Sequence, residues 1–495
     1  MLTKRFYIET VGCQMNVLDS ELVAAGLLAA GYQRADTHRT ADVILFNTCS
    51  VRQHAEDKIY SALGRLKNIK DRHPHKVIGV IGCMAQKDGP LIFKRAPHVD
   101  LVVGPSQLGR LPALVELAAA GAGPQLEVST DRKQETHLDA KTSFTPFDPQ
   151  RMIEARAAAH QAMVRIMFGC DKFCSFCIVP SVRGPEQSRA PDEIEAEVRQ
   201  LAEQALRQGV CLEVTLLGQT VNSYRYKLPD GSGSAVTAAH QEVRPTRQEV
   251  RPTHRREFLL SDLLYRLHNI QGLTRLKFVS NCPRHMTQEL LDTVAALPKV
   301  APYLHVPAQS GSDSVLGRMR RNYTAGEYRE MLERIYATVP HAAVTSDFIV
   351  GFCGETEDEF QQTVDLLRDA QFKNSFVFKY SARPGTKAAE LYADDVPYKV
   401  KQRRNNELLA VQNEITEQLN RRLVGQTVDI LVEGFSKAGA KQNDQNAPAQ
   451  LGGRTVCDRI VVFDGDRSLI GQIVPVEIVQ SARLTLFGRL INRNV

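Results

Sequence analysis

The sequence lacks the two features that would place a chain in or beyond a membrane. No apolar run reaches the roughly 20 residues that a membrane-spanning helix requires. The N-terminus, MLTKRFYIETVGC, passes from two basic residues into a strand-like alternation, without the apolar block and small-residue cleavage site of a secretory signal. We therefore expect a cytoplasmic chain in a reducing compartment, with no membrane partner.

A strong charge of one sign is also missing. The formal net charge is +6 over 495 residues, a mild excess that weakly favours an anionic partner such as RNA. By contrast, the chain holds ten cysteines. A disulfide framework is not expected in a reducing compartment, because that arrangement belongs to short secreted chains. The cysteines point instead to metal or redox chemistry.

The sequence also lacks a fourth cysteine beside a group of three. The stretch FGCDKFCSFCIVP holds Cys170, Cys174 and Cys177 without a further Cys or His beside them. A structural zinc ion normally closes its shell with four protein ligands, so three thiolates leave one coordination position for another molecule. An iron–sulfur cluster with one open iron fits this pattern better, and zinc is the alternative.

Three more cysteines stand at the ends of predicted strands. KRFYIETVG, ADVILFNT and KVIGVIG lead to Cys13, Cys49 and Cys83, with helices predicted between them. The separations, 49 − 13 = 36 and 83 − 49 = 34 residues, each match one βαβ unit. Since parallel strands end at one edge of a sheet, the thiols are expected to converge. Any one of them alone would be an ordinary buried cysteine, but the repeat favours a second three-thiolate cluster.

The remaining sequence predicts a second α/β region and a small β domain. A Pro- and Gly-punctuated stretch from about 120 to 160 is expected to be a linker, with one crossing strand at most. Short runs after a charged helix around 398–423 predict a small antiparallel β-barrel. Between them, six βα units have strands at 163–167, 212–217, 275–279, 303–306, 344–350 and 376–380.

The predicted fold class is therefore α/β, in three parts. An open parallel α/β sheet domain over 1–125 is followed by a linker over 126–155, a central partial (β/α)6 barrel over 156–400 and a small antiparallel β-barrel over 422–493. The near-duplication QEVRPTRQEVRPTH lies in a segment, 227–256, that we expect to be a disordered surface insertion outside the active face.

Short motifs follow the strand ends of the central domain. GCDKFC, LGQ, SNCPR and PAQSGS come at or just past its first four strands, on the face where barrel enzymes place their active sites. Gly218 and Gln219 of LGQ would permit close approach of a cosubstrate, with ordinary strand-end packing as the alternative. Four cysteines lack partners at ligand spacing and are not proposed as ligands: Cys211, Cys282, Cys353 and Cys457.

The C-x3-C-x2-C spacing, with Phe176 before the last cysteine, resembles the radical S-adenosylmethionine (SAM) superfamily. Over nearly the whole chain the motifs resemble the methylthiotransferases of that superfamily. Because it contains both GCQMN and NTCSVR, the sequence is similar to the branch of the family that acts on tRNA and makes 2-methylthio-N6-dimethylallyladenosine. The motifs are VGCQMNVLDSE, NTCSVR, GCMAQ, GCDKFCSFCIVPSVRGPEQSR, LLGQTVNSY, VPAQSGSDSVLGRMRRNYT, DFIVGFCGETEDEF and YSARPGT.

This resemblance implies two 4Fe-4S clusters. A radical SAM cluster would be held by Cys170, Cys174 and Cys177, and SAM would occupy its open iron. An auxiliary cluster in an N-terminal methylthiotransferase domain would be held by Cys13, Cys49 and Cys83. The resemblance further implies that Ile349 and Gly351 of DFIVGFCGE lie along the SAM adenine, and that the C-terminal barrel is a TRAM domain that binds tRNA.

The expected reaction is methylthiolation of carbon 2 of N6-dimethylallyladenosine at tRNA position 37, next to the anticodon. By resemblance, one SAM donates its methyl to a sulfur on the auxiliary cluster and a second generates the radical that activates the base, because this carbon is too unreactive for acid–base exchange. Expected partners are tRNA, an electron donor such as flavodoxin or ferredoxin, and an iron–sulfur and sulfur supply system, with the chain as a monomer.

Three alternatives remain at this point. The substrate could be N6-threonylcarbamoyladenosine in tRNA or an aspartate of a ribosomal protein, or the chain could be a non-catalytic iron–sulfur carrier. The chain also departs from the family pattern, since Asn281 and Cys282 stand where relatives commonly show Ser and His. Arg318, Arg320 and Arg321 form a candidate RNA patch, for which a solvated helix face is the alternative.

Overall fold

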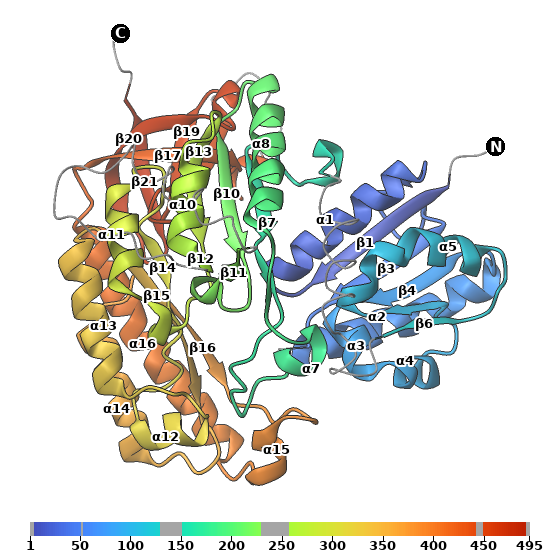
Figure 1. Ribbon diagram of the computed structural model, residues 1–495, viewed down its shortest axis with the longest axis horizontal. Coiled ribbons are helices and arrows are strands. Elements are labelled where there is room, and N and C mark those ends of the chain that lie inside the picture. Colours follow the sequence, from blue (N-terminus) through green and yellow to red (C-terminus); the bar gives the residue numbers. More distant parts are fainter. Residues whose placement is uncertain (1–3, 51–52, 129–150, 229–256, 442–448, 492–495) are drawn as a thin grey trace. The chain divides into compact units, whose positions relative to one another are not determined.

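The computed structural model describes residues 4–50, 53–128, 151–228, 257–441 and 449–491. They form two compact units (Figure 1). The first comprises Met1–Ala157, Met163–Arg189 and Leu217–Gln219; the second comprises Ala158–Ala162, Ala190–Leu216 and Thr220–Val495. The cysteine-rich loop at 170–177 is thus part of the same compact unit as the N-terminal residues. The predicted domain bounds stay predictions.

The first unit is built on a six-stranded sheet in the order β2-β1-β3-β4-β5-β6, and each neighbouring pair of strands is parallel. Its strands are β1 (Arg5–Val11), β2 (Gln33–Arg34), β3 (Val43–Thr48), β4 (Val77–Ile81), β5 (Leu101–Val103) and β6 (Gln125–Glu127). Its helices are α1 (Gln14–Ala29), α2 (Gln53–Arg72), α3 (Cys83–Asp88), α4 (Pro90–Arg95) and α5 (Leu111–Ala119). The three strands predicted here are β1, β3 and β4, and the three others are short.

Continuous apolar sequence explains why β3 and β4 lie inside this sheet. Every residue of VILFNT in β3 and of VIGVI in β4 is buried, as expected for parallel strands covered on both faces. On one face Ile44, Phe46 and Ile78 pack against side chains of α2, α3 and α4. Helices α1 and α5 contact each other as well as the sheet. The β3 and β4 ends are therefore held in a rigid, fully covered layer.

Six strands carry the central region, as predicted. They form two three-stranded sheets, β13-β10-β7 and β14-β15-β16, and a single parallel bridge between Leu276 and Val300 links β13 to the segment before β14. The strands are β7 (Gln161–Arg165), β10 (Leu212–Leu217), β13 (Leu273–Phe278), β14 (Tyr303–His305), β15 (Ala343–Val350) and β16 (Asn374–Lys379). The main helices between them are α8 (Pro191–Arg207), α10 (Leu260–His268), α11 (Gln288–Ala296), α13 (Ala325–Thr338) and α14 (Glu357–Ala370).

The C-terminal residues close into a five-stranded barrel in the order β17-β18-β19-β21-β20, preceded by the long helix α16 (Tyr398–Arg421). The strands are β17 (Thr427–Phe435), β18 (Ala449–Thr455), β19 (Ile460–Gly465), β20 (Ile473–Ser481) and β21 (Thr485–Leu490). One detail of the prediction was wrong, because β19 and β21 pair in parallel while the other pairs are antiparallel. Closure removes the exposed sheet edges.

Three predicted features lie partly or wholly outside the described residues: the linker beyond residue 128, the insertion from 229 to 256 and the Gln- and Asn-rich loop at 442–448. The insertion begins and ends at a short antiparallel pair, β11 (Arg225–Lys227) with β12 (Glu257–Leu259).

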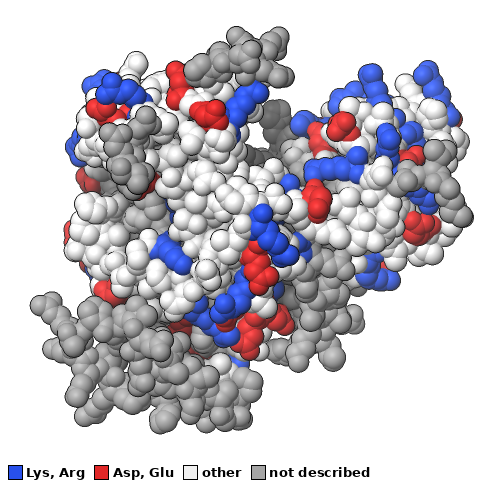
Figure 2. All heavy atoms as spheres, turned by 90° about the horizontal axis from the view of Figure 1, so that it is seen from above, with Lys and Arg blue, Asp and Glu red and all other residues white. Residues whose placement is uncertain are grey.

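None of the helices in the described ranges is long and apolar enough to cross a membrane. On the face shown in Figure 2, Lys and Arg side chains lie among Asp and Glu rather than forming one continuous basic stripe.

Candidate iron–sulfur centre

Three neighbouring strands position the first cysteine trio. Cys13 caps α1 two residues after β1, Cys49 follows β3 directly, and Cys83 opens α3 two residues after β4. Because β1, β3 and β4 are adjacent and parallel, the three positions lie at one edge of the sheet. A side-chain hydrogen bond joins Cys49 to Cys13. Cys49 and Cys83 are buried, and Cys13 is exposed.

Two buried asparagines hold these strand ends together. The Cys13 thiol donates to Asn16 Oδ1 at 3.2 Å, and Asn16 Nδ2 donates to Asn47 Oδ1 at 2.8 Å. Asn47 Nδ2 in turn donates to the Asn16 carbonyl oxygen at 2.8 Å. Glycines make this approach possible: a Cβ on Gly12 would lie 2.9 Å from the Cys49 Cβ, and one on Gly82 would lie 2.3 Å from Asn47 Oδ1. Any larger residue would push the strand ends apart.

The second trio stands on a loop that closes on itself. β8 (Met167–Phe168) pairs with β9 (Gln187–Ser188), and the Cys170 N–H donates to the Gly184 carbonyl at 3.2 Å. Gly169 has φ +70°, and a Cβ there would lie 1.9 Å from the Pro185 carbonyl oxygen. The Cys177 N–H donates to the Cys174 carbonyl at 3.0 Å. This trio therefore depends on local loop geometry rather than on distant strands.

A short helix connects the two trios. α7 (Val179–Arg183) begins two residues after Cys177, and Ile178 and Val182 pack in one apolar cluster with Cys83. Its last residue, Arg183, is buried and places Nη2 2.7 Å from Asp19 Oδ2. Arg165 Nη1 lies 3.1 Å from Asp19 Oδ1. Asp19 on α1 therefore takes one guanidinium on each carboxylate oxygen.

The two sheet-edge thiols Cys13 and Cys83 differ in their electrostatics. The hydrogen bond from Cys49, opposed by burial and reinforced by the Arg183 charge, lowers the pKa of Cys13 to about 6. Burial raises the pKa of the Cys83 thiol, and the Arg183 guanidinium opposes that rise. A low thiol pKa favours the thiolate, which is the form that binds metal. Arg183 thus favours the thiolate at both positions.

Buried polar groups beside the first trio fit an iron–sulfur cluster. In the described part of the chain, no three His, Cys, Asp or Glu side chains come close enough to hold a single metal ion. A cluster binds each thiolate through a different iron, so its ligands need not meet at one point. Polar atoms without hydrogen-bond partners in the described structure also lie buried beside the cysteines: Thr48 Oγ1, Ser50 Oγ and Arg183 Nη1. A cluster with its sulfides would supply acceptors for such donors.

Comparison with known families divides the chain into three matches. Residues 5–104 match "Uncharacterized protein family UPF0004", residues 164–367 match the Radical SAM superfamily, and residues 421–491 match the TRAM domain. Full-length relatives are more specific. A Rhodopirellula baltica protein named tRNA-2-methylthio-N(6)-dimethylallyladenosine synthase is 53% identical over 490 residues, covering 99% of this chain and 96% of the relative.

The chain belongs to this synthase family. A Delftia acidovorans protein of the same name is 41% identical, with 100% of each chain covered. The family predicted from the motifs is therefore confirmed, as is its function as a radical SAM enzyme of tRNA methylthiolation. Family membership also brings an iron–sulfur cluster and SAM as cofactor and cosubstrate.

A solved structure shares the fold of this synthase-family chain at low identity. It is the radical S-adenosylmethionine methyltransferase TsrM from Kitasatospora setae, with a TM-score of 0.50 and 13% identity over 78% of this chain and 77% of the other. The likeness extends beyond the radical SAM region alone. Together with the TRAM match and the closed C-terminal barrel, it confirms the predicted fold class.

The predicted SAM-binding residues of this synthase-family chain are divided between the two units. Gly218 and Gln219 follow β10 and belong with the cysteine loops, since the Ile166 N–H donates to the adjacent Leu217 carbonyl at 2.9 Å. In the second unit, Ile349 lies in β15, one residue before its end, and Gly351 directly follows the strand. A Cβ on Gly351 would lie 2.3 Å from Cγ of Lys401, so protein packing already accounts for this glycine. Contact of these four residues with SAM stays a prediction.

The sequence departure at residues 281–282 makes structural hydrogen bonds. Asn281 Nδ2 donates to the His305 carbonyl at 3.0 Å, which links the segment after β13 to β14. The Cys282 N–H donates to Asn222 Oδ1 at 2.7 Å, and Asn222 Nδ2 returns a hydrogen bond to the Cys282 carbonyl at 2.8 Å. These residues therefore hold neighbouring strand ends together, and this structural role does not require the histidine that relatives commonly show at this position.

Two of the three arginines proposed for RNA binding face the protein. Arg318 pairs with Glu359 at 2.9 Å, and Arg321 donates to the Pro307 carbonyl at 3.1 Å. Arg320 is exposed. The patch stays a prediction, and Arg320 is the member most available to a partner.

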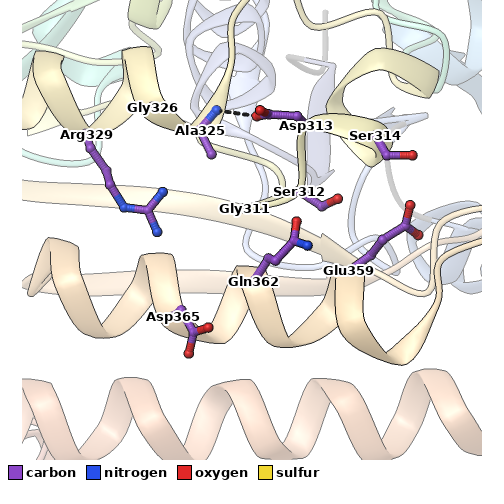
Figure 3. Close-up of a pocket in the computed structure, with 10 residues that line it drawn as sticks. All are labelled: Gly311, Ser312, Asp313, Ser314, Ala325, Gly326, Arg329, Glu359, Gln362 and Asp365. Atoms are coloured by element: carbon purple, nitrogen blue, oxygen red, sulfur yellow. Dashed lines mark hydrogen bonds between the residues drawn. The ribbon is translucent and has the colours of Figure 1, made fainter.

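The motif containing these arginines also borders a polar cavity of about 510 Å³ (Figure 3). Asp313 accepts a hydrogen bond from the Ala325 N–H at 2.7 Å there, and Arg329 pairs with Asp369 at 3.0 Å. The ten residues that line the cavity include no cysteine and no residue predicted to contact SAM. We assign it no role in the reaction.

Sequence reasoning missed the residues that support the cysteines. Asn16 and Asp19 stand in VGCQMNVLDSE, Asn47 in NTCSVR, and Arg183 in the motif after the second trio. Their presence inside the motifs was the available signal. Their roles become visible only when distant segments are seen in contact.

Proposed function

We propose that this chain methylthiolates carbon 2 of N6-dimethylallyladenosine at position 37 of tRNA, using two iron–sulfur clusters and SAM. The observation that carries the proposal is the presence of two separate cysteine trios in one compact unit, in a chain 53% identical over 99% of its length to a synthase of that name. A single trio would suffice for reductive cleavage of SAM. A second one supports a separate site for the sulfur.

Six cysteines would hold the two clusters. Cys170, Cys174 and Cys177 would bind the cluster that supplies the electron for SAM cleavage, and Cys13, Cys49 and Cys83 the one that supplies sulfur. In each trio at least one cysteine is buried and at least one is accessible: Cys170 is buried while Cys174 is half-buried, and Cys83 is buried while Cys13 is exposed. Such a trio can anchor a cluster and still present one side to a substrate.

The chain's own residues position and shield these groups. Asn16 and Asn47 fix the loop of Cys13 beside Cys49, and glycines keep side chains out of the crevice. Gly218 and Gln219 would meet the amino-acid end of SAM, where backbone N–H and carbonyl groups can approach closely. Ile349 and Gly351 would lie along its adenine.

The C-terminal barrel supports tRNA as the substrate. It matches the TRAM domain, and buried ion pairs fix it to the central strands: Lys277 Nζ lies 2.9 Å from Asp458 Oδ1, and Glu213 Oε2 lies 2.9 Å from the same Lys277 nitrogen. Gln161 Nε2 also donates to Glu433 Oε1 at 2.9 Å. A tRNA held by the barrel would keep a fixed distance from the central strands. The target base must leave its stack to react.

Other parts of the proposal concern supply and assembly. The chain would act as a cytoplasmic monomer, with a flavodoxin or ferredoxin donating the electron and an iron–sulfur and sulfur supply system restoring the clusters. The sign of the net charge, +6, favours tRNA and an acidic electron carrier alike.

Nucleoside analysis tests the proposed substrate. In a strain from which the gene is deleted, mass spectrometry of tRNA nucleosides should show the dimethylallyl nucleoside without its methylthio group, and the wild-type gene should restore that group. Complementation with Cys49→Ala should fail, whereas Cys211→Ala, at a cysteine not proposed as a ligand, should succeed. Loss of methylthio from the threonylcarbamoyl nucleoside instead would overturn the assignment.

A further inference from the structure

A buried arginine lies between the two cysteine trios. Arg183 ends α7, six residues after Cys177, and its side chain is 1% exposed. The same helix segment packs Ile178 and Val182 against Cys83. The loop of the second trio therefore delivers a guanidinium to the sheet edge where the first trio stands.

The Arg183 guanidinium is only partly satisfied by protein groups. Nη2 pairs with Asp19 at 2.7 Å, while Nη1 is buried and has no hydrogen-bond partner in the described ranges. Arg183 interacts electrostatically with both Cys13 and Cys83, and with Cys83 also through a side-chain hydrogen bond. The remaining donor capacity of Arg183 is thus directed to the neighbourhood of Cys83 and Cys13.

Buried charges gather at this place. Arg165 and Arg183 both pair with the carboxylate of Asp19, and Arg183 therefore shares its counter-charge with a second guanidinium. All three side chains are at most 3% exposed. A buried charge is costly unless counter-charges and acceptors are near. A cluster bound through thiolates carries negative charge and would give Arg183 both.

We propose that Arg183 is a positioning residue that tunes the cluster on Cys13, Cys49 and Cys83 by placing a fixed positive charge and a free N–H donor beside it. This inference rests on the second cluster of the proposed function. Reduction adds one negative charge to a cluster, so a buried cation beside it stabilises the reduced form and raises the reduction potential. Hydrogen bonds to cluster sulfurs act in the same direction.

A redox titration separates this role from a merely structural one. In full-length chains with Cys170, Cys174 and Cys177 all replaced by Ala, the cluster on the first trio can be titrated alone and followed by electron paramagnetic resonance. Arg183→Gln should shift its midpoint to a more negative potential. Arg183→Lys, which keeps the charge, should restore most of the difference. Arg165→Gln removes the other partner of Asp19 and should shift the midpoint less.

The iron content and the midpoint potential of these variants together decide whether the proposal holds. An Arg183→Gln protein with wild-type iron content and an unmoved midpoint overturns the proposal. If Arg183→Gln loses iron, an Arg183→Lys protein that keeps both iron and midpoint supports the role of charge, and loss of iron from both variants overturns it. Absence of iron from the triple-alanine chain with Arg183 intact rejects the second cluster itself, and with it the proposed function.

Discussion

The two cysteine trios are built in opposite ways within one unit. Cys13, Cys49 and Cys83 come from three strands of one sheet, so their spacing depends on the register of β1, β3 and β4. The other trio occupies a single loop, closed by the short pair β8–β9 and by the contact of Gly169 with Pro185. A site built from a sheet inherits the rigidity of the whole domain, whereas a loop site can change without unfolding it. Under the proposed function, the sheet-built site would suit storage of a group, and the loop site would suit exchange of a cosubstrate.

Replacing one ligand in each trio should give the largest effect and separate the two roles. Cys174→Ala should abolish SAM cleavage, because the cluster at the loop loses a thiolate. Cys49→Ala should stop product formation but retain some abortive SAM cleavage. Cleavage is measured by chromatography of deoxyadenosine with anaerobically reconstituted protein. Cys211→Ala is the matched control and should leave both readouts near wild type.

Iron content checks the same comparison without relying on turnover. The wild-type chain should hold about eight irons, and each single-ligand variant about four, if each trio holds one 4Fe-4S cluster as proposed. A wild-type value of about four would leave only one of the two sites able to hold a cluster.

Asp19→Asn should produce the next largest effect, on stability. The substitution removes the carboxylate with which the buried Arg165 and Arg183 both pair, and breaking a buried ion pair in this way costs about 3–5 kcal/mol. The urea midpoint of the metal-free chain, followed by circular dichroism, should fall accordingly. Glu127→Gln breaks the exposed pair with Arg110, at 2.8 Å in the same unit, and should cost less than about 1 kcal/mol. Equal midpoints for the two variants would contradict the buried network.

A smaller effect is expected from substituting either of two glycines that have nearly the same φ. Gly82 has φ +87° and Gly31 has φ +88°. A Cβ at Gly31 would meet nothing within 4 Å, whereas one at Gly82 would lie 2.3 Å from Asn47 Oδ1. Gly31→Ala should therefore cost only the backbone strain of about 1–2 kcal/mol. Gly82→Ala should cost about 1–3 kcal/mol more through overpacking.

Iron content gives this glycine pair a second readout. Gly82→Ala displaces the segment that carries Cys83, so reconstituted protein should contain less iron than the wild type. Gly31→Ala should bind iron normally, because its helix end is remote in sequence from every proposed ligand. Two variants with equal stability and equal iron content would show that the sheet edge tolerates displacement.

The two sites differ in how far they could be predicted from the sequence, because one is built from a single loop and the other from three strands. The loop trio is visible in the spacing of Cys170, Cys174 and Cys177, which is a local property. The sheet trio could be predicted only through repeated strand–helix lengths, since β1, β3 and β4 had to be adjacent and parallel for it to form. Asp19 and Arg183 could not be paired in advance, because 164 residues separate them and neither spacing nor periodicity joins them.

Short elements escaped prediction for a similar reason. β2 and β5 have two and three residues, too few to show a period, and they form because β1 and β4 offer them hydrogen-bonding edges. The parallel pairing of β19 with β21 depends on barrel closure, which is a property of all five strands together. Tertiary contact decides such features after the local sequence has specified the longer elements.

The smallest predicted effect concerns thiol reactivity in the metal-free chain. The pKa of Cys13 is lowered to about 6 from an ordinary value of 9.0. At pH 7 its larger thiolate fraction outweighs its weaker nucleophilicity, so alkylation should be about three- to sixfold faster than for a peptide thiol of ordinary pKa. At pH 9 the peptide thiol is itself largely ionised, and the order should reverse. Iodoacetamide labelling followed by peptide mass spectrometry measures both rates. Cys49→Ala removes the hydrogen bond that contributes most to the shift, so the reversal should disappear in that variant, and its persistence would show that Cys49 does not lower the pKa of Cys13.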